Sequence, residues 1–73
     1  NPSSGQVVLR SQRFSGAEVQ LLLISTLGRV HQVNLQRQSA TLLLFDMSDL
    51  AAGTYSGILT INGEQSALKL LRD

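Results

Sequence analysis

The amino-acid sequence predicts an all-β fold. Short apolar stretches alternate with glycine-containing or polar turn signals along the whole chain of 73 residues, a spacing typical of antiparallel strands. Asn62-Gly63, between two such stretches, is the strongest short-range signal for a hairpin with a type I′ turn. Two sheets packed face to face would bury the apolar rows. We therefore expect one small antiparallel β-sandwich of immunoglobulin-like shape with six to seven strands.

The strands and turns follow from the positions of the apolar residues. Strands are expected at residues 6–11, 19–24, 30–36, 41–45, 55–61 and 66–72, and turns at 14–16, 27–29, 37–39, 51–53 and 62–63. Only Gln20 interrupts the apolar run 19–24, which fits a central strand covered on both faces. A buried helical turn would have the same periodicity. Gly28 and Gly53 supply backbone that adopts positive φ at little cost.

Alternation along the strands also predicts the core. Tyr55 is expected to place its ring in the core and its hydroxyl at the edge. Residues 46–49 are expected to lead out of the sheet, and Leu50 is expected to pack back onto the core after them. The other inward rows are Val7 and Leu9, Val33 and Leu35, Leu43 and Phe45, Leu59 and Ile61 with Gly57, and Leu68 and Leu70.

Composition excludes several classes of function. The formal net charge is +1, and the basic residues form no run. With only three aromatic residues beside them, they do not form the basic, aromatic surface of a nucleic-acid binder. No apolar run approaches the ~20 residues that span a bilayer, so no transmembrane segment is expected. Residues 1–5 are expected to be the end of a linker that enters a single domain at 6–73.

No set of residues in the sequence matches a catalytic or metal-binding pattern. His31 is the only histidine, and no carboxylate pair stands at metal-ligand spacing from it. Cysteine and the G-x-S-x-G signature are both absent. Asp46 and Asp49 could form a carboxylate pair, but aspartates after a strand more often cap local backbone N–H groups. We therefore expect no catalytic, cofactor or metal site, and a binding or structural module that is not an enzyme. The aromatics Phe14, Phe45 and Tyr55 lie on separate elements, so they do not predict a sugar-stacking row.

Several short motifs follow one another in a specific order. They are the NPSSG opening, Gly28-Arg29-Val30, the segment FDMSDLAAGTY with Leu50, Gly53 and Tyr55, the run 58–61, Asn62-Gly63, and Leu68-Lys69-Leu70. In this order and spacing they resemble the type A C-terminal sorting domain of the type IX secretion system of Bacteroidota, over essentially the whole chain. The sequence departs from the family pattern at Ser25, where many members carry aspartate, at Thr54, where an aliphatic residue is usual, and at its Arg72-Asp73 end.

The resemblance implies that the domain is a sorting signal. In this family the translocon recognises the C-terminal sandwich of a periplasmic cargo and exports it. A sortase-like peptidase then removes the domain and joins the cargo to anionic lipopolysaccharide at the outer-membrane surface. A few members instead keep the domain as part of the secretion or attachment machinery, where it binds a partner protein or lipopolysaccharide.

The last two strands, at 55–61 and 66–72, are the candidate recognition surface. A terminal hairpin can leave an edge strand open to strand addition, which would also favour a dimer through that edge. Lys69 and Arg72 would attract an acidic partner or lipopolysaccharide phosphates, or are solvated surface charges. The candidate recognition residues are Gly28, Arg29, Leu50, Gly53, Tyr55, Asn62, Gly63, Leu68, Lys69 and Leu70.

Overall fold

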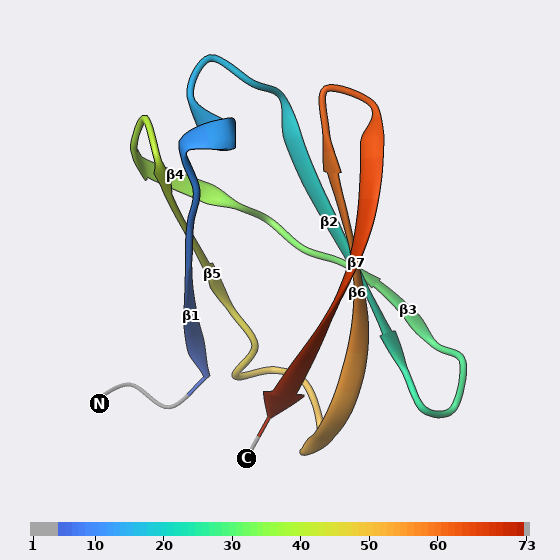
Figure 1. Ribbon diagram of the computed structural model, residues 1–73. Coiled ribbons are helices and arrows are strands. Elements are labelled where there is room, and N and C mark those ends of the chain that lie inside the picture. Colours follow the sequence, from blue (N-terminus) through green and yellow to red (C-terminus); the bar gives the residue numbers. More distant parts are fainter. Residues whose placement is uncertain (1–4, 73) are drawn as a thin grey trace.

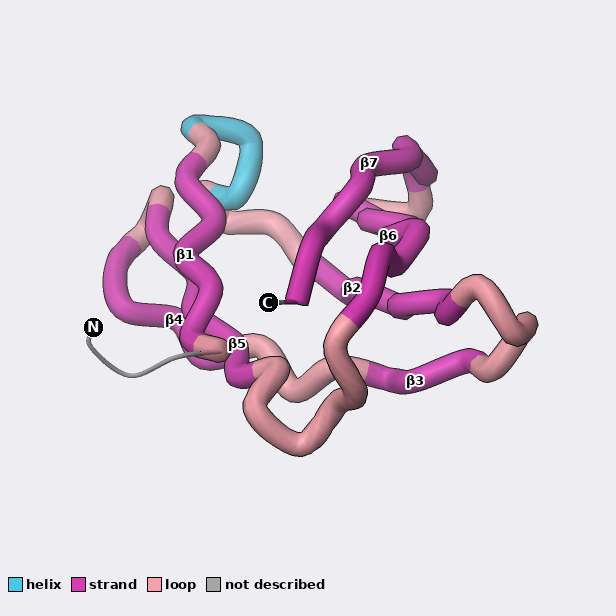
Figure 2. Tube along the Cα trace, turned by 90° about the horizontal axis from the view of Figure 1, so that it is seen from below, coloured by secondary structure: helices cyan, strands magenta, loops and turns pink. Residues whose placement is uncertain are grey.

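The computed structural model describes residues 5–72 and shows seven antiparallel strands in two facing sheets (Figures 1 and 2). The strands are β1 (Gln6–Arg10), β2 (Val19–Ser25), β3 (Val30–Gln32), β4 (Gln36–Ser39), β5 (Leu42–Asp46), β6 (Gly53–Ile61) and β7 (Glu64–Arg72). A 3₁₀ helix, η1 (Gln12–Phe14), follows β1. The three-stranded sheet has the order β1-β5-β4, and the four-stranded sheet has the order β3-β2-β6-β7. The predicted all-β sandwich is confirmed.

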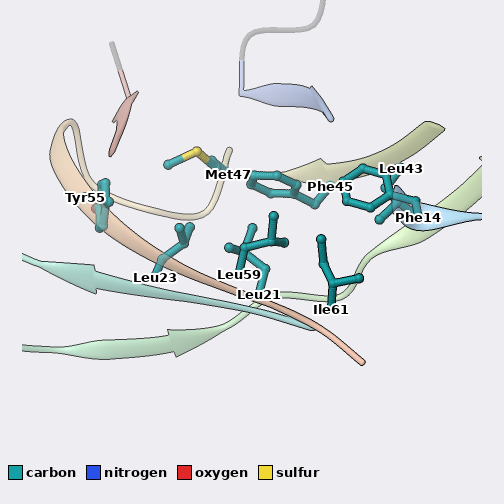
Figure 3. Close-up of a cluster of buried hydrophobic side chains, with 9 residues drawn as sticks. All are labelled: Phe14, Leu21, Leu23, Leu43, Phe45, Met47, Tyr55, Leu59 and Ile61. Atoms are coloured by element: carbon teal, nitrogen blue, oxygen red, sulfur yellow. The ribbon is translucent and has the colours of Figure 1, made fainter. Parts of the chain in front are cut away.

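The core lies between the two sheets. Nine apolar side chains are buried there, and Figure 3 shows them converging from both layers: Phe14, Leu21, Leu23, Leu43, Phe45, Met47, Tyr55, Leu59 and Ile61. The predicted rows of β5 and β6 are among them, so their inward faces are confirmed. Val7, Leu9, Val33, Leu35, Leu50, Leu68 and Leu70 are half-buried and pack against this cluster, as expected.

The prediction that the run 19–24 is covered on both faces is wrong. β2 is a central strand between β3 and β6, and its inward residues Leu21 and Leu23 are 2% and 0% exposed. Leu22 points the other way and is 37% exposed, because no segment within residues 5–72 forms a second layer on the outer face of the four-stranded sheet. A run of apolar residues does not by itself distinguish a strand that is buried on both faces from a strand whose outer face is exposed to solvent.

The predicted strand at 30–36 is two strands in different sheets. β3 pairs with β2 in the four-stranded sheet, whereas β4 pairs with β5 in the three-stranded sheet. Residues 33–35 cross between the sheets, and Val33 and Leu35 stay half-buried along the way. The alternation of apolar residues therefore continues through a segment that changes partner, which makes it look like one strand in the sequence.

The polar turn expected at 37–39 is also displaced. These residues belong to β4, and the turn follows at 40–41. Arg37 holds the segment, since its guanidinium donates to the backbone oxygens of Ala40 at 2.9 Å and Ala17 at 3.0 Å. A side chain that bonds carbonyl groups from two segments allows a wholly polar stretch to remain a strand.

Two arginine side chains connect the ends of β7 to segments beside the three-stranded sheet. Arg13 of η1 forms an ion pair of 3.0 Å with Glu64 at the start of the strand. Arg72 at its end donates from Nε to the backbone oxygen of Met47, also at 3.0 Å. Both contacts join β7 to segments that flank the three-stranded sheet, although the Arg13–Glu64 pair is solvent-exposed and contributes little to stability.

Gly57 marks the tightest approach between neighbouring side chains on β6. A Cβ at this position would lie 2.8 Å from Cδ1 of Leu68 and 3.5 Å from Cδ1 of Leu21. The absence of a side chain on Gly57 therefore makes room for Leu68 to point inward from β7.

We expect Gly57→Val to lower the free energy of unfolding by about 1–3 kcal/mol, since the added methyl groups overpack Leu68 and Leu21. Ser56→Val, on the exposed face of the same strand, is the matched control and is expected to change stability little. Urea denaturation of both variants measures the difference. Equal stability of the two variants would contradict the packing described here.

Candidate recognition edge

β7 is an edge strand, and half of its backbone groups face away from the sheet. It pairs with β6 from Gly53↔Arg72 to Ile61↔Glu64 without a register shift. The N–H of Asn62 donates to the carbonyl of Glu18 at 2.9 Å, so Asn62 faces the β2 side of the ladder. Because backbone direction alternates along an antiparallel strand, Ile61 faces β7. The N–H and C=O groups of Gln65, Ala67, Lys69 and Leu71 therefore point away from β6.

The other three edges of the described sheets are shorter or interrupted. β3 has three residues, and β1 has five. β4 has four residues and a register shift between Arg37 and Ser39. β7 has nine residues, no proline and no bulge, and Lys69 is the only charged residue among the four that face outward. Natural sheets usually protect such edges with proline, bulges, charges or short strands. β7 is thus the edge best suited to accept another strand.

The hairpin turn at Asn62-Gly63 confirms the sequence prediction. Both residues have positive φ, 49° and 87°, as a type I′ turn requires. The side-chain oxygen of Asn62 also accepts a hydrogen bond of 3.0 Å from the backbone N–H of Glu18. Asn62 therefore sets the register of β6 against both β7 and β2.

Tyr55 stabilises the opposite end of β6. Its side chain is 4% exposed, and its hydroxyl donates to the carbonyl of Ala51 at 2.6 Å. This bond closes the chain over residues 51–55 at the start of the strand, much as the tyrosine corner does in immunoglobulin-like sandwiches. Gly53, with φ of 146°, lies inside this closed segment, and the half-buried Leu50 leads into it. The core position and edge hydroxyl predicted for Tyr55 are confirmed.

The turn that contains Gly28 and Arg29 lies at the same end of the sheet, because Ser25 pairs with Tyr55. Gly28 has φ of 84°, and its N–H donates to the carbonyl of Ser25. The hydroxyl of Ser25 accepts from the N–H of Leu27 at 3.3 Å and from the N–H of Arg29 at 3.2 Å. A short oxygen-bearing side chain before a turn is the role that aspartate also fills.

The candidate residues thus form two groups. Gly28, Arg29, Gly53 and Tyr55 lie at one end of the four-stranded sheet, Leu50 lies in the loop that leads to this end, and Asn62 and Gly63 lie at the other end. Leu68 and Leu70 point inward from β7 between these ends, and Lys69 is exposed. Gly53, Tyr55, Asn62, Gly63, Leu68 and Leu70 build the β6–β7 hairpin, Gly28 and Arg29 belong to the β2–β3 turn, and Leu50 lies in the loop before β6.

Arg72 has a structural role that the sequence did not indicate. It is half-buried and donates to the backbone oxygens of Met47 and Ser48, the latter from Nη2 at 3.5 Å. The sequence would have to show that a basic residue at the end of a strand lies opposite a loop with available carbonyl groups. Such a contact between distant segments leaves no regular spacing in the sequence.

An open groove of about 890 Å³ lies beside the loop after β5. His31, Asn34, Asp46 and Asp49 are among its lining residues, and the ring of His31 meets Tyr55 edge-on with centroids 6.1 Å apart. Within residues 5–72 no group of three histidine or acidic side chains is placed to hold a metal ion. Asp46 caps the loop as the sequence suggested, since its Oδ1 accepts from the N–H of Ser48 at 2.8 Å.

Comparison with known proteins gives no assignment. No protein-family model, curated protein or solved structure matches the chain. Among the described residues there is no helix of the length and apolar character that crossing a bilayer requires.

The hydrogen bonds from Ser48 hold the pKa of Asp46 below its usual value, with a further contribution from the charge of Arg72. A lowered pKa in the folded state stabilises the fold above the unfolded-state pKa, which is about 3.9, and this stabilisation is lost as the carboxylate becomes protonated. We expect Asp46→Asn to lower Tm at pH 7. The gap between variant and unmodified chain should close as the pH falls below the folded pKa of Asp46. Thermal unfolding followed by circular dichroism across this range measures the gap, and a gap independent of pH would contradict the capping role.

Proposed function

We propose that the chain is a sorting domain that a secretion system of type IX recognises: a non-enzymatic module that directs a periplasmic cargo across the outer membrane. The observation that carries the proposal is the long, unbroken free edge of β7. The partner would read this edge by adding a strand to it, with backbone hydrogen bonds supplying affinity and alternate side chains supplying specificity.

The motif positions support this proposal because they maintain the β6–β7 hairpin. Asn62 and Gly63 form its turn, and Gly53 and Tyr55 fix the segment that leads into it. Leu68 and Leu70 face the core side of β7, beside the inward positions of β6. A recognition module needs such an element to be held firmly, since a mobile strand would lose conformational entropy on binding.

The departures from the family pattern are compatible with the same role. Ser25 bonds the turn backbone in the way expected of aspartate. Thr54 has an exposed side chain, so the core does not require an aliphatic residue at that position. Residues 1–4 of the NPSSG motif and Asp73 lie outside the described residues.

The proposed partners are the translocon that accepts the domain and the sortase-like peptidase that removes it. The cargo would pass through the periplasm and remain at the outer-membrane surface or outside the cell. A retained domain that holds lipopolysaccharide receives less support, because Arg72, one of its two expected cationic contacts, is half-buried and bonds backbone oxygens.

We expect Ala67→Pro to block export while the domain stays folded. The N–H of Ala67 points away from β6, so proline leaves the hairpin ladder intact and removes a donor only from the free edge. One lost hydrogen bond, together with the bulk of the ring, should weaken strand addition roughly tenfold or more. Cargo carrying the variant should accumulate in the periplasm of its native host.

Val8→Pro is the matched control, because Val8 pairs with Leu44 on β1 at a position whose N–H also faces a free edge. This variant is expected to support normal export. Immunoblots of fractionated cells, with one antibody against the cargo and one against the domain, give the readout. Normal surface display of the folded Ala67→Pro variant would overturn the proposal, and a single full-length band at the outer membrane would show a retained domain.

A further inference from the structure

The interior of the sandwich is least covered along the side where β1 and β7 lie (Figures 1 and 2). Within residues 5–72, three connections join the two sheets. Residues 11–18 lead from β1 to β2 at the Asn62 end, and residues 47–52 lead from β5 to β6 at the Arg72 end. Residues 33–35 cross on the side of β3 and β4. None of these described connections crosses on the side of β1 and β7.

β1 lies opposite β7 across the core. The ion pair of Arg13 with Glu64 links the segment after β1 to the start of β7. At the other end Arg72 bonds the carbonyl of Met47, and the N–H of Met47 donates to the carbonyl of Gly5, immediately before β1. The two strands therefore run past each other in opposite directions, one in each sheet.

The inward side chains of these two strands are only partly covered. Val7 and Leu9 of β1 and Leu68 and Leu70 of β7 are half-buried and pack against the core, whereas the nine core side chains are at most 9% exposed. We call Val7, Leu9, Leu68 and Leu70 the edge row. Further apolar surface in the edge row can still be removed from water, which is favourable.

The edge row lies beside the backbone groups of β7 that have no partner strand. A strand that pairs with the outward N–H and C=O groups of β7 would continue the four-stranded sheet, and every second side chain of it would point to the same side as Leu68 and Leu70. The other side chains would lie beside the outward row of β7, which contains the polar residues Gln65 and Lys69. One strand can thus satisfy the free edge and cover the edge row.

We infer that the segment accepted by β7 is an amphipathic strand, with aliphatic side chains at alternate positions that cover Leu68 and Leu70 and complete the core. The inference rests on the proposed strand addition and names the chemical class of the partner segment. Backbone hydrogen bonds would be available to any extended peptide, so burial against the edge row would select among them.

Two other occupants fit less well. In a second copy, Leu68 and Leu70 of β7 already pack against that copy's own core, so they are not free to cover the edge row. The hydrocarbon of a membrane has no donors or acceptors for the outward backbone groups of β7.

The test uses the isotopically labelled 73-residue chain and two synthetic peptides of identical composition, valines among threonine, lysine and glutamate. The first peptide has valine at every second position, and the second has valine at every third position, so that neighbouring inward positions are never both valine. The first should bind roughly tenfold or more tightly, because it buries more apolar surface. It should shift the outward amides of β7 and the methyl signals of the edge row, whereas the second should shift the amides alone.

Val7→Thr tests the edge row without touching the hydrogen bonds of β7. It replaces a methyl group with a hydroxyl of similar size, and it should weaken binding of the first peptide roughly threefold or more and leave the second unchanged. Val8→Thr is the matched control, because Val8 is the next residue of β1 and is 53% exposed on its outer face. It should bind both peptides like the unmodified chain, and circular dichroism checks that both variants are folded.

The outcomes separate this inference from the proposed function. Equal binding of the two peptides, with shifts confined to the amides of β7, would overturn the inference and leave strand addition intact. Binding of neither peptide would contradict strand addition itself, and the inference with it. Shifts of the same amides on raising the concentration of the chain alone would assign the edge to a second copy and would also overturn the inference.

Discussion

The continuous register of β6 with both of its neighbours is the constraint on which the rest of the structure depends. Every residue of this nine-residue strand is paired with β7, and seven are paired with β2. Because side chains alternate along a strand, a slip of one residue would turn Tyr55, Leu59 and Ile61 out to solvent. Two contacts prevent such a slip: the turn and side chain of Asn62 at one end, and the hydroxyl bond of Tyr55 to Ala51 at the other.

This register also determines which parts of the sheet can meet a partner. It directs alternate backbone groups of β7 to the free edge, and it keeps Leu68 and Leu70 on the inward side of the same strand. The residues that resemble a sorting motif hold this arrangement in place. A firmly held edge is what strand addition, the mode of recognition proposed above, requires.

Much of the fold could be predicted from local pattern. The inward rows of β5 and β6 and the turn at Asn62 follow from alternation and turn chemistry, which act over a few residues. The split of 30–36 between two sheets could not be predicted, because its apolar alternation continues through the crossover. Likewise, the sequence predicted a hairpin, but only the strand order shows that β7 is an edge. Leu22 was predicted to be covered because an apolar run does not reveal that one face of its sheet is open. The bonds of Arg72 to the loop of Met47 could not be predicted because they join residues far apart in sequence.

Hydrogen exchange at the backbone amides of β7, followed by NMR on the isolated chain, tests the free edge most directly. Amides of Ser66, Leu68 and Leu70 face β6 and should exchange slowly, whereas those of Gln65, Ala67, Lys69 and Leu71 should exchange fast. This alternating pattern is the result that the account predicts. Uniform protection along β7 would contradict it, because the outward amides would then already be paired and unable to receive a partner strand.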